Sequence, residues 1–368
     1  MQRWWHPDRL ASRRDRLAAR GRILAATRQF FAGEGFVEVE TPALQVSPGI
    51  EPHLRAFATL LSDPRDNSLK PRYLHTSPEF AMKKLLAGGM RQIWQLAHAF
   101  CDGERGPTHH PEFAMLEWYR TGATYDALME DCEALLRRTA AAVAPHPSPL
   151  PASGEREGPA AKPWGGEGPR LQWQGRTADP NHPFGRLSVA EAFACHTGID
   201  ILATAPDPDR PSLALLAEAA AGIGIATHPG DDWESLYFRI FLDRIEPKLG
   251  IGAPTILYDF PVSMAALSRQ KPGDPRLCER FELYVCGLEL ANAFTELTDP
   301  AEQRGRFIAD QAKKQRLYGH TYPIDDDFLA ALEHGLPDCA GIALGFDRLV
   351  MLCTGADGME DVLWAPVE

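Results

Sequence analysis

Two pairs of apolar segments constrain the fold of this chain more than any other feature. Residues 91–100 (RQIWQLAHAF) are typical of a strand that enters a loop, and residues 112–120 (EFAMLEWYR) of the strand that leaves it. A second pair of strands surrounds Gly287 in residues 280–297 (RFELYVCGLELANAFTEL). Short connections favour antiparallel pairing, because parallel strands need a crossover of a dozen or more residues. The pattern predicts an α+β fold, in which helices pack on a large antiparallel sheet, rather than alternating βαβ units.

Helical spacing and capping signals place the remaining elements. Helices are expected over residues 8–32, 78–86, 187–200, 211–225 and 300–319, a strand over 254–261, and a Gly-rich strand that runs into a helix over 338–355. Before the second helix, Ser77 is a candidate cap and Pro78 a candidate first residue. The helix over 300–319 is amphipathic, with Ile308 and Ala312 on one face.

Residues 144–186 differ in composition from the rest of the chain. They hold nine Pro and seven Gly among 43 residues. Such a segment cannot bury enough apolar surface to offset the entropy of ordering it. We therefore expect a disordered surface insertion that separates residues 1–143 from residues 187–368, the latter beginning with a small helical module.

Composition and charge exclude several classes of protein. The chain has 50 Asp and Glu against 38 Lys and Arg, which argues against non-specific binding to a nucleic-acid backbone. No apolar run approaches the ~20 residues of a membrane span. The seven cysteines form no Cys-x-x-Cys pair, so we expect reduced thiols in a cytoplasmic protein. A zinc site at His109 and His110 would need further ligands, and only Glu112 is close.

Several carboxylates lie on or beside the predicted strands. Glu282 and Glu289 flank the turn at Gly287, where they could share a divalent cation such as Mg²⁺. The seven-residue spacing of Glu282 and Glu289, taken alone, instead favours two exposed glutamates that bind no cation. Glu296 follows Asn292 in an otherwise apolar segment, and a buried carboxylate needs a cationic partner. A bound ammonium group and a local arginine are equally compatible with the pattern.

The final segment suggests a site for phosphate. Gly341 and Gly345 allow close approach of the backbone, and Arg348 stands at the start of the last predicted helix. Backbone donors and a guanidinium together bind phosphate well. The same glycine spacing also serves simple packing of a helix on a sheet.

The order of these motifs resembles the catalytic domain of class II lysyl-tRNA synthetases. The matching segments are FVEVETPAL, TSPEFAMKKLL, THHPEFAMLEWYR, RFELYVCGLELANAFTEL and GIALGFDRLVML. The similarity is closer to a truncated paralogue family of that synthetase, the elongation factor P lysine ligases. The first motif begins at Phe36, so we expect no N-terminal anticodon-binding barrel. Residues 1–143 would then hold motifs 1 and 2, and residues 187–368 a helical insert and motif 3.

The resemblance implies an activity, partners and site residues. The activity is ATP-dependent activation of (R)-β-lysine, or lysine, as an adenylate, followed by transfer to a lysine of elongation factor P. Mg²⁺ is the implied cofactor, a homodimer with Pro42 at its interface is the implied assembly, and tRNA is not an expected substrate. The implied residues are His109, Phe113 and Arg348 for ATP, Glu282 and Glu289 for Mg²⁺ and ATP, Glu79, Glu117, Tyr119, Ala291, Asn292 and Glu296 for the amino acid, and Glu104, Arg105 and Arg348 for catalysis. Alanine rather than glycine at position 291 favours the paralogue.

One position departs from the family pattern. An arginine that binds the α-phosphate and the substrate carboxylate is implied directly after Phe100, but this chain has Cys101. Three interpretations are open: Arg105 supplies the missing cation, the enzyme is slow, or the chain is an impaired paralogue that binds ATP or a partner. Ala293 also replaces a family glycine, which we expect to crowd its strand. A free-standing lysyl-tRNA synthetase and an ammonia-dependent asparagine synthetase are the alternative enzymes.

Overall fold

The computed structural model describes residues 3–143 and 170–368. Its helices are α1 (Pro7–Gly33), α2 (Glu79–Ala87), α3 (Tyr125–Ala141), α4 (Val189–Thr197), α5 (Leu213–Gly222), α6 (Trp233–Ile240), α7 (Pro300–Tyr318), α8 (Asp326–Gly335) and α9 (Phe346–Thr354). Its strands are β1 (Val37–Glu38), β2 (Leu44–Gln45), β3 (Ala58–Ser62), β4 (Leu69–Leu74), β5 (Gln92–Phe100), β6 (Glu112–Thr121), β7 (Leu171–Trp173), β8 (Arg176–Ala178), β9 (Gly185–Ser188), β10 (Thr255–Pro261), β11 (Leu277–Val285), β12 (Leu288–Thr295) and β13 (Cys339–Gly345).

An eight-stranded sheet with the order β1-β5-β6-β13-β12-β11-β10-β9 forms the centre of the molecule. Its six inner strands are antiparallel, as the two predicted strand pairs require. The two edge strands differ, because β1 pairs with β5 and β9 pairs with β10 in parallel. The α+β prediction is therefore confirmed, with a mixed rather than a purely antiparallel sheet.

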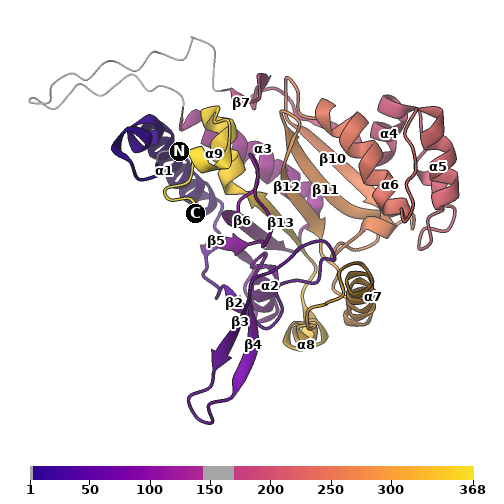
Figure 1. Cartoon of the computed structure of the whole chain (residues 1–368), viewed down its shortest axis with the longest axis horizontal. Coiled ribbons are helices and arrows are strands. Elements are labelled where there is room, and N and C mark those ends of the chain that lie inside the picture. The colour runs from indigo at the N-terminus through magenta and orange to yellow at the C-terminus, as the bar shows by residue number, and fades with distance from the viewer. Residues whose placement is uncertain (1–2, 144–169) are drawn as a thin grey trace, which may run out of the picture.

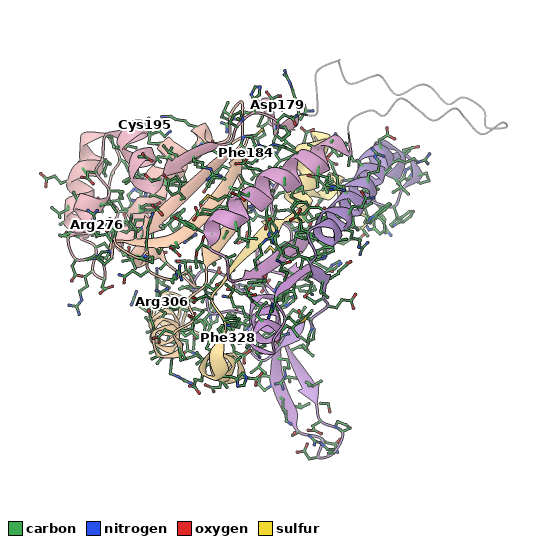
Figure 2. The ribbon with its side chains drawn as sticks, turned by 180° about the vertical axis from the view of Figure 1, so that it is seen from behind. Asp179, Phe184, Cys195, Arg276, Arg306 and Phe328 are labelled. Atoms are coloured by element: carbon green, nitrogen blue, oxygen red, sulfur yellow. The ribbon has the colours of Figure 1, made fainter. Side chains whose placement is uncertain are left out.

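Three groups of helices pack around this sheet (Figure 1). α1, α3 and α9 pack against it through a core in which Phe31 stacks on Trp94 with ring centroids 4.8 Å apart. α4, α5 and α6 form the predicted helical module beside β9 and β10. α2, α7 and α8 enclose a third core around Phe80, which stacks on Phe328 at 4.6 Å. In the view from behind, Phe328 and Arg306 mark α8 and α7 at this end of the molecule (Figure 2).

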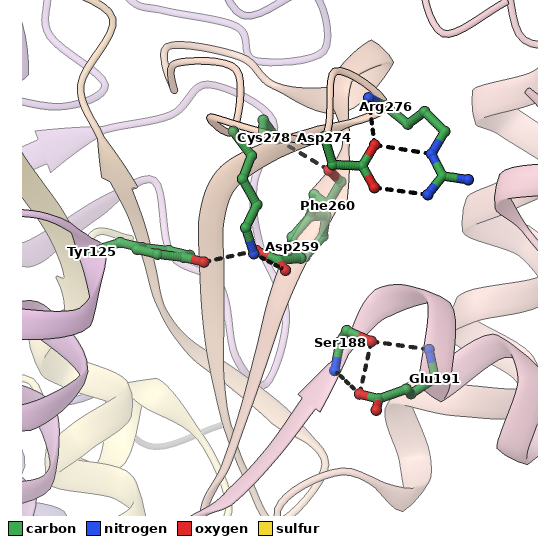
Figure 3. A network of polar contacts seen from close by, with 9 residues as sticks. Tyr125, Ser188, Glu191, Asp259, Phe260, Asp274, Arg276 and Cys278 are labelled. Atoms are coloured by element: carbon green, nitrogen blue, oxygen red, sulfur yellow. Dashed lines mark hydrogen bonds and ion pairs between the residues drawn. The ribbon is translucent and has the colours of Figure 1, made fainter.

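Polar contacts fix the junctions between these groups (Figure 3). Ser188 and Glu191 form a reciprocal capping box at the start of α4, an arrangement that satisfies two backbone donors that the helix itself leaves free. The Tyr125 hydroxyl donates to Asp259 Oδ1 at 2.7 Å and so ties α3 to β10. Asp259 is also ion-paired with Lys271. The sheet is thereby held in one position relative to its helices.

The predicted insertion over residues 144–186 extends too far. Residues 144–169 lie outside the described residues, whereas residues 170–186 contribute β7, β8 and the first part of β9. Leu171, Ala178 and Phe184 are buried in the main core. Composition was misleading here, because a few well-spaced apolar residues suffice to anchor a Gly- and Pro-containing segment on an existing core.

The apolar face of α7 also differs from the prediction. Ile308 is 55% exposed, and the helix turns Phe307 toward Phe80 and Phe328 instead. All seven cysteines are free, and all except Cys195 are buried. Within the two described ranges, none of the helices has the length and apolar character needed to cross a bilayer.

Candidate active site

A cavity of about 380 Å³ lies against β6, β12 and β13 and is lined by most of the predicted site residues. The predicted residues in its lining are Glu79, Glu104, His109, Phe113, Glu117, Tyr119, Glu289, Ala291, Asn292, Glu296 and Arg348. Two predicted residues, Glu282 and Arg105, are not among the lining residues. Side chains from four distant parts of the sequence therefore meet in one place.

Strand alternation explains why these side chains face the same way. Successive side chains of a strand point to opposite faces of a sheet, so Phe113, Glu117 and Tyr119 share one face of β6. Ala293 lies on β12 between Asn292 and Phe294, which both line the cavity. It is fully buried in the core beneath the helices. Ala293 itself is not among the lining residues, so the crowding expected of it on its strand does not reach the cavity.

Lys83 holds two of the predicted substrate-binding glutamates. Its side chain is 1% exposed and forms ion pairs with Glu79 and, at 2.5 Å, with Glu296. Burial disfavours the ammonium, but Glu296 and Glu79 outweigh it and raise the pKa of Lys83. Burial raises the pKa of Glu296 to about 8, although Lys83 acts in the opposite direction. The cationic partner of the buried Glu296 is thus Lys83, a lysine of the chain itself that is distant in sequence.

Glu117 is fully buried and forms no ion pair with a cationic side chain in the described part of the chain. Its carboxylate accepts hydrogen bonds from Ser77 Oγ at 2.5 Å and from Tyr119 Oη at 2.8 Å. Burial, followed by the charge of Glu79, raises the pKa of Glu117 to about 8. A positively charged ligand beside Glu117 would favour its ionised form.

Gly341 on β13 makes room for this pocket. A Cβ atom at position 341 would overlap the ring of Tyr119 and the carboxylate of Glu296. The packing thus demands glycine at this position, in agreement with the close approach expected from the sequence. Gly345 is less constrained, since its Cβ would lie 3.3 Å from Cδ of Arg348.

Arg348, in the first turn of α9, is held in the cavity by three contacts. It donates to the carbonyl oxygen of Glu289 at 2.8 Å and to that of Thr108 at 3.2 Å. Its third nitrogen lies 3.0 Å from His109 Nε2. Burial and the guanidinium lower the pKa of His109, so a neutral ring beside a fixed cation faces the cavity.

Glu282 and Glu289 lie on the neighbouring strands β11 and β12, as predicted. Burial, followed by Glu282, raises the pKa of Glu289 to about 8, and two such carboxyls close together favour binding of a cation. Across the described ranges, the Glu289 carboxylate has no hydrogen-bond or ion-pair partner. Both carboxylate oxygens of Glu282 already accept hydrogen bonds, one from Arg280 at 2.6 Å and the other from Tyr284. Glu289 thus fits an oxygen-ligated cation better than Glu282 does.

The loop that follows β5 does not supply a cation from Arg105. Arg105 donates to the carbonyl of Val367 at 3.0 Å and is absent from the cavity lining. Cys101 is buried and lines the cavity, and burial together with Glu104 raises the pKa of its thiol to about 12. Cys101 is therefore a neutral group, and the interpretation in which Arg105 replaces the arginine finds no contact to support it.

Three contributors to the site were missed in the sequence. Lys83 follows Glu79 by four residues on a predicted helix, a spacing at which side chains meet, so this pair could have been found. Ser77 was predicted only as a helix cap. Its hydroxyl accepts a hydrogen bond from the Glu79 amide at 3.1 Å, but the N-cap position is occupied by Pro78, which was expected inside the helix. Asp347 accepts from the Ala114 amide at 2.7 Å and pairs with Arg20, and nothing local in the sequence indicates this link.

Comparisons with known proteins identify the family of the chain. The family model of class II tRNA synthetases (D, K and N) matches residues 2–368. The elongation factor P–(R)-β-lysine ligase of Vibrio cholerae is 38% identical over 98% of this chain and 97% of its own length. The corresponding ligase of Pectobacterium carotovorum is 36% identical over 99% and 98%. A lysine–tRNA ligase of Pelotomaculum thermopropionicum is 35% identical over 95% of this chain but only 62% of its own length. The chain belongs to the class II tRNA synthetase family, and its full-length relatives are elongation factor P–(R)-β-lysine ligases.

Proposed function

We propose that the chain activates (R)-β-lysine, or lysine, with ATP and transfers it to a lysine side chain of elongation factor P. The observation that carries this proposal is one cavity that holds both the Arg348–His109 pair and three glutamates, of which Glu117 and Glu296 are buried and Glu79 is partly exposed. The Arg348–His109 pair suits the phosphates of ATP, and the glutamates suit the ammonium groups of a lysine-like substrate. The names of the full-length relatives support the choice of substrate and acceptor.

The reaction has two steps. A carboxylate oxygen of the amino acid forms a bond to the α-phosphorus of ATP while the bond to pyrophosphate breaks. The neutral amine of the acceptor lysine then attacks the carbonyl carbon, loses a proton, and AMP leaves. No side chain has to form a covalent bond, so the protein contributes positioning and charge stabilisation. The neutral thiol of Cys101 needs no role as a nucleophile.

The amino-acid pocket is matched to two positive charges. Glu79, Glu117 and Glu296 carry three negative charges when ionised, and the buried Lys83 carries one positive charge. Their sum of −2 is equal and opposite to the two ammonium groups of (R)-β-lysine or lysine. Asn292 and Ala291 complete the lining of the pocket. A methyl group at position 291 narrows the space beside β12 and favours the β-amino acid over lysine.

ATP would occupy the remainder of the cavity. Phe113 offers a ring for the adenine, and Arg348 and His109 would bind the outer phosphates. Glu289, with Glu282 behind it, would hold Mg²⁺, because this cation prefers carboxylate and phosphate oxygens. When bound, Mg²⁺ would neutralise charge on the phosphates.

We further propose a homodimer. Several large apolar side chains are exposed on β1 and on the β2-β4-β3 sheet, and β1 and β2 are the strands on either side of Pro42 in the chain. These side chains are Val37, Leu44, Leu60, Leu61 and Leu69. Contiguous exposed apolar surface is typical of protein–protein contacts. Light scattering coupled to size-exclusion chromatography tests this, and Leu60→Lys is expected to shift the mass toward the monomer.

ATP–pyrophosphate exchange with (R)-β-lysine, with lysine and without an amino acid tests the first step. We expect amino-acid-dependent exchange that is greater with (R)-β-lysine. Absence of exchange in the native protein and its appearance in Cys101→Arg would instead identify an impaired paralogue. Transfer assays with elongation factor P and with tRNA test the acceptor. Charging of tRNA alone would favour the second candidate, a lysine–tRNA ligase, to which the chain is also related.

A further inference from the structure

The wall of the cavity around Cys101 lacks positive charge. Among the described lining residues, Arg348 is the one arginine, against seven carboxylates: Glu51, Glu79, Glu104, Glu117, Glu289, Glu296 and Asp347. Glu104 and Glu51 lie near enough to Cys101 to raise the pKa of its thiol. On the proposed function, an ATP phosphate and a substrate carboxylate must approach each other in this cavity. Two anions beside an acidic wall repel each other unless a cation separates them.

Arg55 lies next to this wall. Its carbonyl oxygen accepts a hydrogen bond from the Asp102 amide at 2.7 Å, which places its backbone beside the residue that follows Cys101. Its side chain donates from Nε to Asp102 Oδ2 at 2.6 Å, and Nη2 lies 2.5 Å from the same oxygen. Leu54, directly before Arg55, lines the cavity as Cys101 does. The two chain segments therefore run together along the rim.

We propose that Arg55 supplies the guanidinium that position 101 lacks. When ATP and the amino acid bind, its side chain leaves Asp102 and binds the α-phosphate and the substrate carboxylate together. A planar guanidinium has the geometry to bridge two anions, which a cysteine cannot do. This inference rests on the proposed function and extends it to a residue outside the family motifs quoted above.

The exchange of partners requires little structural change. The Arg55 side chain is 61% exposed, and an exposed ion pair is weak, whereas a charge-assisted contact to phosphate is among the strong ones. The backbone on both sides stays anchored, because Asp102 donates to Arg55 and the Ala56 amide donates to Tyr322 Oη at 2.8 Å. Redirecting the guanidinium then calls for rotation about the side-chain bonds of Arg55.

Other cations near the cavity are already engaged. Lys83 is buried between two glutamates, and Arg105 binds the carbonyl of Val367. Arg280 is held by Glu282 at 2.6 Å and by the carbonyl of Met264 at 2.7 Å. Arg55 combines a position on the rim with an exposed, exchangeable partner.

The test compares Arg55→Gln with Arg65→Gln in ATP–pyrophosphate exchange with (R)-β-lysine. Arg65 serves as the control, since its exposed side chain also pairs with an aspartate, Asp63, at 2.7 Å between β3 and β4, outside the cavity lining. We expect Arg55→Gln to lower kcat by about 10²-fold, the typical cost of removing one donor to a developing charge. Arg65→Gln should stay within about twofold of the native protein, and the melting temperatures of the two variants should agree.

Rescue provides the second readout. Cys101→Arg introduced into Arg55→Gln is expected to restore exchange at least tenfold, because it returns a guanidinium to the same wall. If Arg55→Gln keeps native exchange while the native protein is active, the proposal on Arg55 is overturned. If the native protein shows no exchange with either amino acid, the proposed ligase function fails instead. The Kd for Mg-ATP, measured by calorimetry, then tests the proposal on Arg55. A Kd for Arg55→Gln that is fivefold or more above that for Arg65→Gln supports the proposal, and an unchanged Kd overturns it.

Discussion

Lys83→Met probes the buried charge cluster most directly. The substitution keeps the length of the side chain but removes the ammonium that pairs with Glu79 and Glu296. Removing one partner of a buried ion pair typically costs about 3–5 kcal/mol, because the remaining charge stays desolvated. We therefore expect a loss of about 3–5 kcal/mol in the free energy of unfolding at pH 9, above the pKa of about 8 that Glu296 has in the native protein.

The pH dependence of this loss gives a stricter test. The folded-state pKa of Glu296 is already about 8, against an ordinary 4.5, and it rises further without Lys83. A carboxyl whose pKa is raised by folding binds more protons in the folded state, so stability falls as pH rises through this window. The difference between variant and native protein should therefore shrink toward pH 6, by at most about 1.4 kcal/mol per pH unit for each titrating carboxyl.

Urea unfolding followed by circular dichroism at pH 6 and pH 9 measures both quantities. Lys70→Met serves as the control, since Lys70 pairs with Asp63 at 2.9 Å and is 45% exposed. An exposed pair of this kind contributes about 0–1 kcal/mol. A loss in Lys83→Met no larger than in Lys70→Met, or a loss independent of pH, would refute the reasoning that Lys83 neutralises a buried acidic cluster.

Three further predictions concern the same cavity. The affinity for (R)-β-lysine, measured by calorimetry, should increase as the pH rises from 6 to 8, because Glu117, with a pKa of about 8, must lose its proton before it can pair with an ammonium group. An affinity that does not change over this range would contradict the assignment of Glu117 to the ammonium site. Gly341→Ala should abolish exchange or prevent folding, since the added methyl group would overlap Tyr119 and Glu296. As a control, Gly21→Ala, which adds a methyl group in open space on α1, should leave expression and melting temperature unchanged. Glu289→Gln should raise the Mg²⁺ concentration needed for half-maximal exchange by about tenfold or more; an unchanged Mg²⁺ dependence would exclude Glu289 as a ligand.

The strands of the site could be predicted because their signals are local. The apolar runs of β6 and β12 and the glycine between β11 and β12 are visible in any short window of the sequence. Helix faces were less certain, since several faces of a mostly polar helix have similar apolar content. In α7, contact with Phe80 and Phe328 decided that Phe307 rather than Ile308 is buried.

The sequence by itself indicated the antiparallel strand pairs and the order of the motifs, because both depend on chain-local patterns, and the family resemblance supplied eleven of the residues that line the cavity. Only the tertiary structure decided which charges meet. It paired Lys83 with Glu296 across more than two hundred residues, left Ala293 out of the cavity lining, directed Arg105 to Val367 and placed Arg55 against Asp102, the residue after Cys101. Electrostatic partners depend on distance and burial in space, and neither quantity is encoded at a fixed spacing along the chain.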